Sequence, residues 1–174
     1  MLTVSSLSDI DHQMQLIVAS AARSQKWMTA QTGDPLEVFR RMKFEPVGCH
    51  PVEDRSLNLV EQINQTWTFV AALAATRILL EKHSGASPFH LAPGAHAALA
   101  LDVMSEDRLV GAEAFAAVKP NNNGKLAADL AKLALHSEIP HRYVFFISPL
   151  FPSIKRQPQL EIDGVEVWSV ISNR

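Results

Sequence analysis

The sequence has a single cysteine, Cys49, so it cannot form an internal disulfide. This is the expected state of a protein in a reducing cytoplasm, where Cys49 is most simply a small buried hydrophobic residue. Long apolar runs are also missing, because the most apolar stretch, residues 67–80, is interrupted by Arg77 and is too short to span a bilayer. The first ten residues lack the basic segment and apolar core of a secretory signal. These absences lead us to expect a soluble cytoplasmic protein without a membrane partner.

Several motifs of catalysis and ligand binding are absent as well. The chain contains no Gly-x-x-x-x-Gly-Lys-Ser/Thr loop, no Gly-x-Gly-x-x-Gly, no Gly-x-Ser-x-Gly elbow and no Cys-x-x-Cys pair. Its seven histidines show no paired spacing that is typical of metal ligands. We therefore do not expect a nucleoside-triphosphate enzyme, a serine hydrolase or a histidine-based metal site.

The chain has no large excess of charge of either sign. Its 16 Lys and Arg against 18 Asp and Glu give a formal net charge of -2, which argues against a strongly basic nucleic-acid scaffold but not against a local contact surface. The acidic residues are concentrated in residues 45–113, and residues 114–174 hold more basic than acidic side chains. With 174 residues and 47% hydrophobic content, the chain can bury one core. We expect a single domain over residues 1–174.

Helical patterning dominates the first part of the chain. Apolar residues recur at helical spacing over about residues 10–28. Asp34 followed by Pro35 predicts a second helix over residues 36–42, because a capping aspartate and a first-turn proline favour a helix start. We expect residues 1–50 to form an N-terminal helical extension.

The remainder predicts a mixture of helices and strands. Apolar periodicity and turn residues place these elements in the following order: a helix over residues 58–83, a strand over 89–91, a hairpin of 97–104 and 109–118, a helix over 125–135 and a strand over 143–147. Asp163-Gly164 is a strong turn signal and predicts a C-terminal hairpin over residues 159–171.

Two acidic side chains, Asp102 and Glu113, interrupt the apolar runs on either side of the first hairpin turn. Acidic side chains are depleted in strands, so their presence here needs a reason. If the turn centres on Glu106 and Asp107, Asp102 lies opposite Gly111 and both carboxylates point to one face of the hairpin. Diagonal neighbours on a face are roughly 7–8 Å apart, which lets two carboxylates reach one divalent cation.

Simpler alternatives stay open for both side chains. Asp102 would cap a turn or pair with Arg108, and Glu113 would face solvent on an edge strand. Under these alternatives the two carboxylates would share no ligand.

The order helix, three strands, helix and strand, with Asp102 on the second strand and Glu113 on the third, resembles the PD-(D/E)xK nuclease superfamily over roughly residues 58–150. The resemblance implies an α/β, restriction-endonuclease-like fold with a three-layer core, in which helices flank a central mixed sheet. In that family the aspartate and glutamate hold magnesium, and a glutamate of the first helix often joins them. Carried over to this chain, the resemblance implies that Asp102, Glu113 and Glu61 bind Mg²⁺ or Mn²⁺.

The family's lysine, two residues after the glutamate, helps to activate water, but Phe115 occupies that position here. Phenylalanine has no charge to stabilise the attacking hydroxide or the transition state. Members of the family can take the lysine from a neighbouring element, which implies Lys125 as the substitute and Lys119 as second choice.

The function implied by the resemblance is a metal-dependent phosphodiesterase, a nuclease that acts on DNA and is expected to be a homo-oligomer. The alternative is a catalytically inactive protein of the same fold that serves as a binding or assembly module. Phe115 and the net negative charge favour this alternative.

Overall fold

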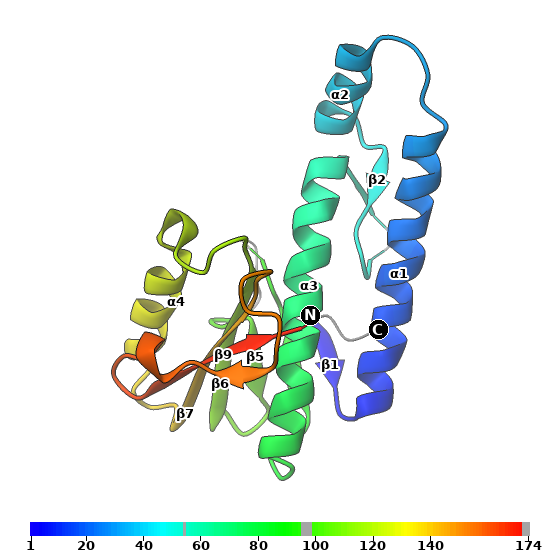
Figure 1. Cartoon of the computed structure of the whole chain (residues 1–174). Helices are drawn as coiled ribbons and strands as arrows, with labels where there is room; N and C mark the ends of the chain where they lie inside the picture. Colours follow the sequence, from blue (N-terminus) through cyan, green and yellow to red (C-terminus); the bar gives the residue numbers. More distant parts are fainter. Residues whose placement is uncertain (54, 95–98, 172–174) are drawn as a thin grey trace.

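The computed structural model describes residues 1–53, 55–94 and 99–171 and has an α/β architecture (Figure 1). In this part of the chain, seven strands form a mixed sheet in the order β1-β4-β5-β6-β7-β9-β8, and two short strands, β2 and β3, pair separately. The strands are β1 (Leu2–Val4), β2 (Gly48–Cys49), β3 (Ser56–Leu57), β4 (Phe89–Leu91), β5 (Val103–Ser105), β6 (Val110–Ala116), β7 (His141–Ile147), β8 (Lys155–Arg156) and β9 (Val165–Val170). The helices are α1 (Leu7–Thr29), α2 (Pro35–Phe44), α3 (Leu59–Lys82) and α4 (Lys125–Ala134).

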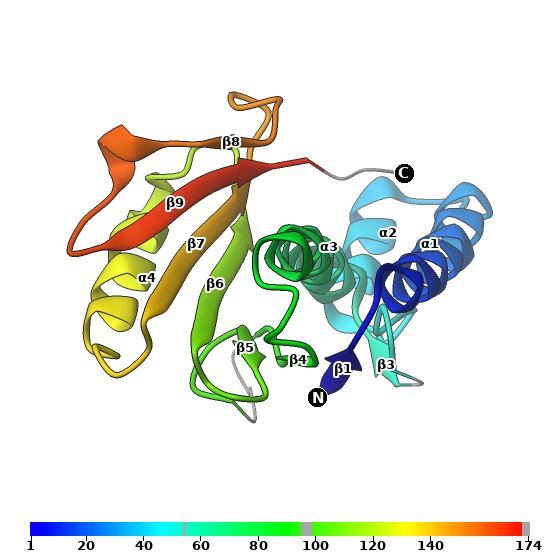
Figure 2. The same ribbon diagram turned by 90° about the horizontal axis from the view of Figure 1, so that it is seen from below.

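Helices cover both faces of the sheet, as Figure 2 shows for β6, β7 and β9 between α3 and α4. On the α3 face, Ala112 and Ala114 of β6 join the larger apolar core. On the α4 face, Phe115 packs in a second core with Leu126 and Leu130 of α4. Because successive strand residues point to opposite faces, Glu113 shares the α4 face with Phe115. The α/β class and the central mixed sheet flanked by helices are confirmed.

The three parallel neighbours at the centre of the sheet are β6, β7 and β9. The meander β4–β5–β6 is antiparallel, and α4 then carries the chain across one face to β7.

The longest helix, α3, has 24 residues. Within the described ranges, no helix is long and apolar enough to cross a membrane.

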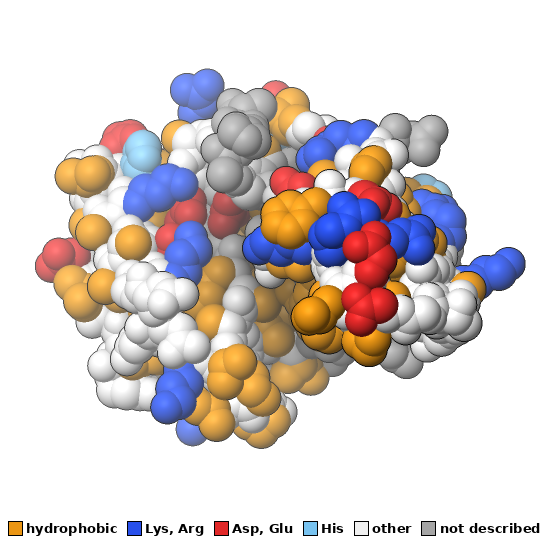
Figure 3. Space-filling view, turned by 90° about the horizontal axis from the view of Figure 1, so that it is seen from above, with side chains coloured by type: hydrophobic (Ala, Val, Ile, Leu, Met, Phe, Trp, Pro, Cys, Tyr) orange, Lys and Arg blue, Asp and Glu red, His pale blue; other side chains and the backbone are white. Residues whose placement is uncertain are grey.

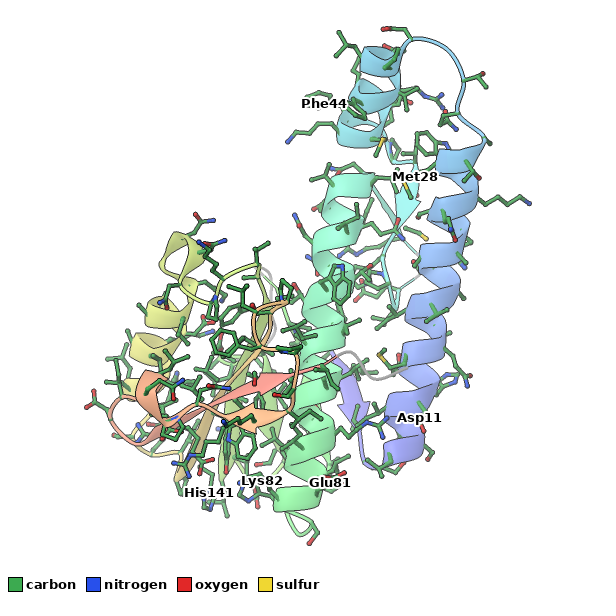
Figure 4. All side chains as sticks on the ribbon, viewed as in Figure 1. Asp11, Met28, Phe44, Glu81, Lys82 and His141 are labelled. Atoms are coloured by element: carbon green, nitrogen blue, oxygen red, sulfur yellow. The ribbon has the colours of Figure 1, made fainter. Side chains whose placement is uncertain are left out.

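The N-terminal helices form an arm with α3 that extends beyond the sheet (Figure 1). Met28 and Phe44 lie at its far end and Asp11 lies near the sheet (Figure 4). Ser6 caps the start of helix α1: its Oγ accepts a hydrogen bond from the Asp9 N–H, while the Asp9 carboxylate accepts one from the Ser6 N–H. This reciprocal capping box satisfies two backbone donors of the first turn.

The prediction for residues 1–50 was incomplete, because Leu2–Val4 form β1 at one edge of the sheet. Three residues are too few for a strand pattern to be recognised in the sequence. The start of α2 was predicted correctly, since Asp34 accepts a hydrogen bond from the Glu37 N–H and Pro35 occupies the first helical position.

The prediction of a C-terminal hairpin over residues 159–171 was only partly right. The turn at Asp163 and Gly164 forms, with positive φ at both residues, and it is flanked by a single bridge between Ile162 and Val165. No strand precedes this turn among the described residues 158–162, because Pro158 opens a 3-10 turn, Pro158–Leu160. Strand β9 instead pairs in parallel with β7 and in antiparallel with β8.

Candidate metal centre

The hairpin β5–β6 brings Asp102 and Glu113 into contact. Val103 pairs with Ala112, so the residue before β5, Asp102, lies beside Glu113 on the neighbouring strand. The Asp102 N–H donates to Oε1 of Glu113 at 3.3 Å, and Oδ2 of Asp102 accepts from the Ala114 N–H at 3.0 Å. Both side chains are buried. The expected acidic pair is therefore present, in the part of the sheet where the β5–β6 ladder ends.

The register differs from the prediction by two residues. Met104, rather than Asp102, lies opposite Gly111, because the connection has four residues, 106–109, and Arg108 adopts a positive φ. Asp107 fixes this longer loop by accepting a hydrogen bond from the Leu109 N–H. A shift of two residues preserves the face to which a side chain points. This is why the carboxylates still meet. Part of the predicted strand, residues 97 and 98, lies outside the described residues.

Gly111 has a packing role beside this pair. A Cβ at Gly111 would come within 2.5 Å of Cδ1 of Leu101, a residue that is fully buried directly before Asp102. A side chain at position 111 would therefore force the buried Leu101 side chain to shift.

The structure agrees only in part with the simpler alternatives given above for Asp102 and Glu113. Glu113 does not face solvent, because it is 2% exposed beneath α4. In the described part of the chain, Arg108 forms no ion pair with Asp102, whose carboxylate bonds to backbone instead. Asp102 does cap a backbone N–H of β6, so it has a structural role in addition to its place beside Glu113.

Helix α4 adds three charged side chains to the pair. Nζ of Lys132 lies 2.7 Å from Oε1 of Glu113, and Nζ of Lys125 lies 2.6 Å from Oδ1 of Asp129. Residues 125, 129 and 132 follow helical spacing, so they share the face of α4 that is turned to the sheet. We call the five residues Asp102, Glu113, Lys125, Asp129 and Lys132 the carboxylate–lysine cluster.

Burial determines the electrostatics of this cluster. It raises the pKa of Asp102 and of Asp129, and it raises the pKa of Glu113 to about 7, helped by the neighbouring charge of Asp102 and opposed by Lys132. With all groups ionised, three carboxylates face two ammonium groups, which leaves one negative charge. A single proton makes the cluster neutral, and the raised pKa of Glu113 favours its binding there.

Sequence reasoning identified Lys125 but missed Lys132, the lysine that contacts Glu113. Lys125 reaches Asp129, and its Nζ lies 5.9 Å from the centre of the Phe115 ring. Phe115 itself is buried and stacks on Phe146. Lys119, the second choice, is exposed after the end of β6. The signal for Lys132 was its spacing of seven residues from Lys125, which places both on one helical face.

Glu61 is not brought to the acidic pair. It lies in the first turn of α3, is exposed, and accepts a hydrogen bond from the Asn58 side chain. It lines a different cavity of about 390 Å³, together with Gln13 of α1 and Arg55. Among the described residues, no three His, Cys, Asp or Glu side chains are arranged to hold a metal ion. The three-carboxylate set of Asp102, Glu113 and Glu61 is therefore not formed.

Two carboxylates are nevertheless a donor set that suits magnesium, which usually keeps several waters and takes one or two protein carboxylates. Asp102 and Glu113 supply these donors. Oδ2 of Asp129 is buried without a hydrogen-bond partner among the described residues. This oxygen and the raised pKa of Glu113 indicate that the two lysines do not fully compensate the three carboxylates. The residues present therefore fit a divalent cation at the Asp102–Glu113 pair.

A groove of about 810 Å³ lies beside the cluster. Four residues of α3 form one side: Ile63, Asn64, Trp67 and Thr68. The floor runs from Phe115 at the end of β6 to Val118 beyond it, and Lys125 at the start of α4 forms the other side. The space-filling view shows the molecule hollowed between its two halves, with hydrophobic side chains in the hollow and charged side chains of both signs beside it (Figure 3). Because Lys125 belongs to both, the groove and the cluster adjoin.

Comparisons with protein-family models, with curated proteins and with solved structures each give no significant match.

Proposed function

We propose that this protein is a metal-dependent phosphodiesterase, a nuclease that acts on DNA, with Asp102 and Glu113 as its metal ligands. The observation that carries the proposal is the buried Asp102–Glu113 pair with Lys132 in contact with Glu113. Buried carboxylates with raised pKa values and a neighbouring lysine are typical of sites that bind a cation and a charged substrate.

The arrangement of elements supports the same proposal. Helix α3, the meander β4–β5–β6, helix α4 and strand β7 follow one another in the order implied by the resemblance to PD-(D/E)xK nucleases. Asp102 directly precedes the second strand of the meander and Glu113 lies on the third. The restriction-endonuclease-like fold is therefore part of this proposal.

Each member of the cluster has a role in the proposed reaction. When bound, Mg²⁺ would lower the pKa of a water and neutralise phosphate charge. Glu113 would need to lose its proton to serve as a ligand, and its contact with Lys132 involves only Oε1. Lys132, beside Glu113, would supply a positive charge to neutralise charge on the phosphate. Lys125, held by Asp129, presents a second positive charge to the groove.

The test is cleavage of linear and plasmid DNA by the purified protein with Mg²⁺ or Mn²⁺ near pH 8. Asp102→Asn and Glu113→Gln should abolish cleavage, and Lys132→Ala should reduce it by about 100-fold. Glu61→Gln is the matched control, because Glu61 is an exposed carboxylate away from the pair. Cleavage that survives in Asp102→Asn would belong to another site or to a contaminant and would refute the proposal.

Two observations favour the second candidate, an inactive protein of this fold that acts as a binding or assembly module. Phe115 fills the position of the catalytic lysine, and Lys132 and Lys125 form ion pairs with Glu113 and Asp129. An intact substrate with both metals, together with an unchanged melting temperature, would support this candidate. The expected homo-oligomer is a proposal that light scattering on the purified protein tests.

A further inference from the structure

The groove beside the carboxylate–lysine cluster has an aromatic side wall. Trp67 of α3 lines it and is 44% exposed, and its neighbour one turn earlier, Ile63, is 48% exposed. Large apolar side chains are normally covered when they line a concave surface, so this pair leaves an apolar face open to a ligand. Val118 continues the apolar surface at the end of the floor and is 63% exposed.

The other lining groups are polar and are suited to a nucleotide. Asn64 on the α3 side, and Asn122 and Asn123 on the α4 side, present exposed amides, which can both donate to and accept from base edges. Lys125 adds a positive charge at the boundary with the cluster. The groove therefore offers an aromatic face on which a base can stack, amides that can bond to the edge of the base, and a lysine that can pair with the phosphate.

The size of the groove also fits such a ligand. Its volume of about 810 Å³ lies within the range of small-molecule sites and is far smaller than a surface that wraps a duplex. In a duplex the base faces are stacked on one another and are not available to Trp67. A base that stacks on an aromatic side chain must be unpaired, as in proteins that bind single strands.

We propose that this groove binds an unpaired segment of single-stranded nucleic acid, with a base stacked on Trp67 and a phosphate beside Lys125. This inference rests on the proposed nuclease function, for which it defines the substrate class. It places the neighbouring phosphodiester at the Asp102–Glu113 pair, since Lys125 belongs to both the groove and the cluster.

Binding is measured in the presence of EDTA, so that hydrolysis does not occur and the result does not depend on a metal. The probes are fluorescently labelled oligothymidylate, oligouridylate and a blunt DNA duplex, with anisotropy as the readout. Oligothymidylate or oligouridylate should bind more tightly than the duplex. Trp67→Ala should weaken binding of the single strand by about 5- to 150-fold, the range for loss of one stacked base.

Two further variants separate stacking from a loss of structure. Trp67→Phe keeps an aromatic face and should restore most of the binding. Phe39→Ala removes another exposed aromatic side chain, on α2 and outside the groove, and should bind like the unmodified protein. Melting temperatures of all variants show that they are folded.

Equal or tighter binding of the duplex would overturn the inference, as would unchanged single-strand binding by Trp67→Ala. These results are distinct from a failure of the proposed function, which is an absence of metal-dependent cleavage. Tighter binding of oligothymidylate than of oligouridylate is expected for the proposed DNA nuclease. The reverse preference would support the groove as a single-strand site but would contradict DNA as the substrate.

Discussion

The raised pKa of Glu113 predicts that replacing this residue by glutamine stabilises the protein at high pH. Glu113 titrates near 4.5 in its ordinary state and near 7 in the folded protein, because burial disfavours its charged form. The folded state therefore binds the proton more tightly than the unfolded state does. The resulting stability is present below about pH 4.5 and is lost as the pH rises through 7.

The magnitude follows from the two pKa values. Between about pH 5 and about pH 8, the unmodified protein loses about 2.5 kcal/mol of unfolding free energy through Glu113. The Glu113→Gln variant has no such proton equilibrium, and its amide oxygen still accepts a hydrogen bond from Lys132. The variant should therefore gain about 2 kcal/mol relative to the unmodified protein over this pH range.

Urea denaturation at a series of pH values measures this difference in unfolding free energy. Glu61→Gln is the exposed control, and its stability relative to the unmodified protein should not change with pH. An effect of Glu113→Gln that is equal at pH 5 and pH 8 would refute the reasoning, because Glu113 would then be ionised throughout. Cooperative unfolding with an unchanged denaturant slope is needed for the comparison.

Two other predictions concern the cation and the first helix. Mn²⁺ should raise the melting temperature more at about pH 8 than at about pH 6, because Glu113 must lose its proton, and Asp102→Asn should remove most of this rise in scanning fluorimetry. An equal rise in both proteins would place the cation elsewhere. Ser6→Ala should lower the unfolding free energy by about 1 kcal/mol in urea denaturation, because the Asp9 N–H loses its acceptor. Unchanged stability would mean that this cap does not contribute in solution.

The helices could be predicted from the sequence because their signals are local. The cap at Asp34 and the proline after it define the start of α2, and the periodic apolar residues of α3 extend over 24 residues. The strands that were missed or misplaced depend on distant partners instead. Strand β1 exists because it pairs with β4, and β9 pairs in parallel with β7 rather than with the residues just before its own turn. Such pairings leave little trace in a short stretch of sequence.

The acidic pair was predictable for a different reason. Alternation along strands fixes which face Asp102 and Glu113 share, and an error of two residues in the register does not change that face. Lys132 and Asp129 were missed because their positions depend on how α4 crosses β6, which is a property of packing. The prediction that Glu61 joins the acidic pair was wrong for the same reason. The direction of α3 relative to the sheet places the first turn of this helix, which carries Glu61, at another cavity.

The absence of a lysine at position 115 has a physical explanation in the packing of α4. Phe115 fills the space beneath Leu126 and Leu130, where an ammonium group would be buried among apolar side chains at considerable cost. Helix α4 instead supplies Lys132, whose Nζ reaches Glu113 from a half-exposed position and so keeps part of its hydration. The positive charge is thus retained beside the acidic pair although the strand position is apolar. Under the proposed function, a cation at the Asp102–Glu113 pair would replace the proton of Glu113, and this exchange would link metal affinity to pH.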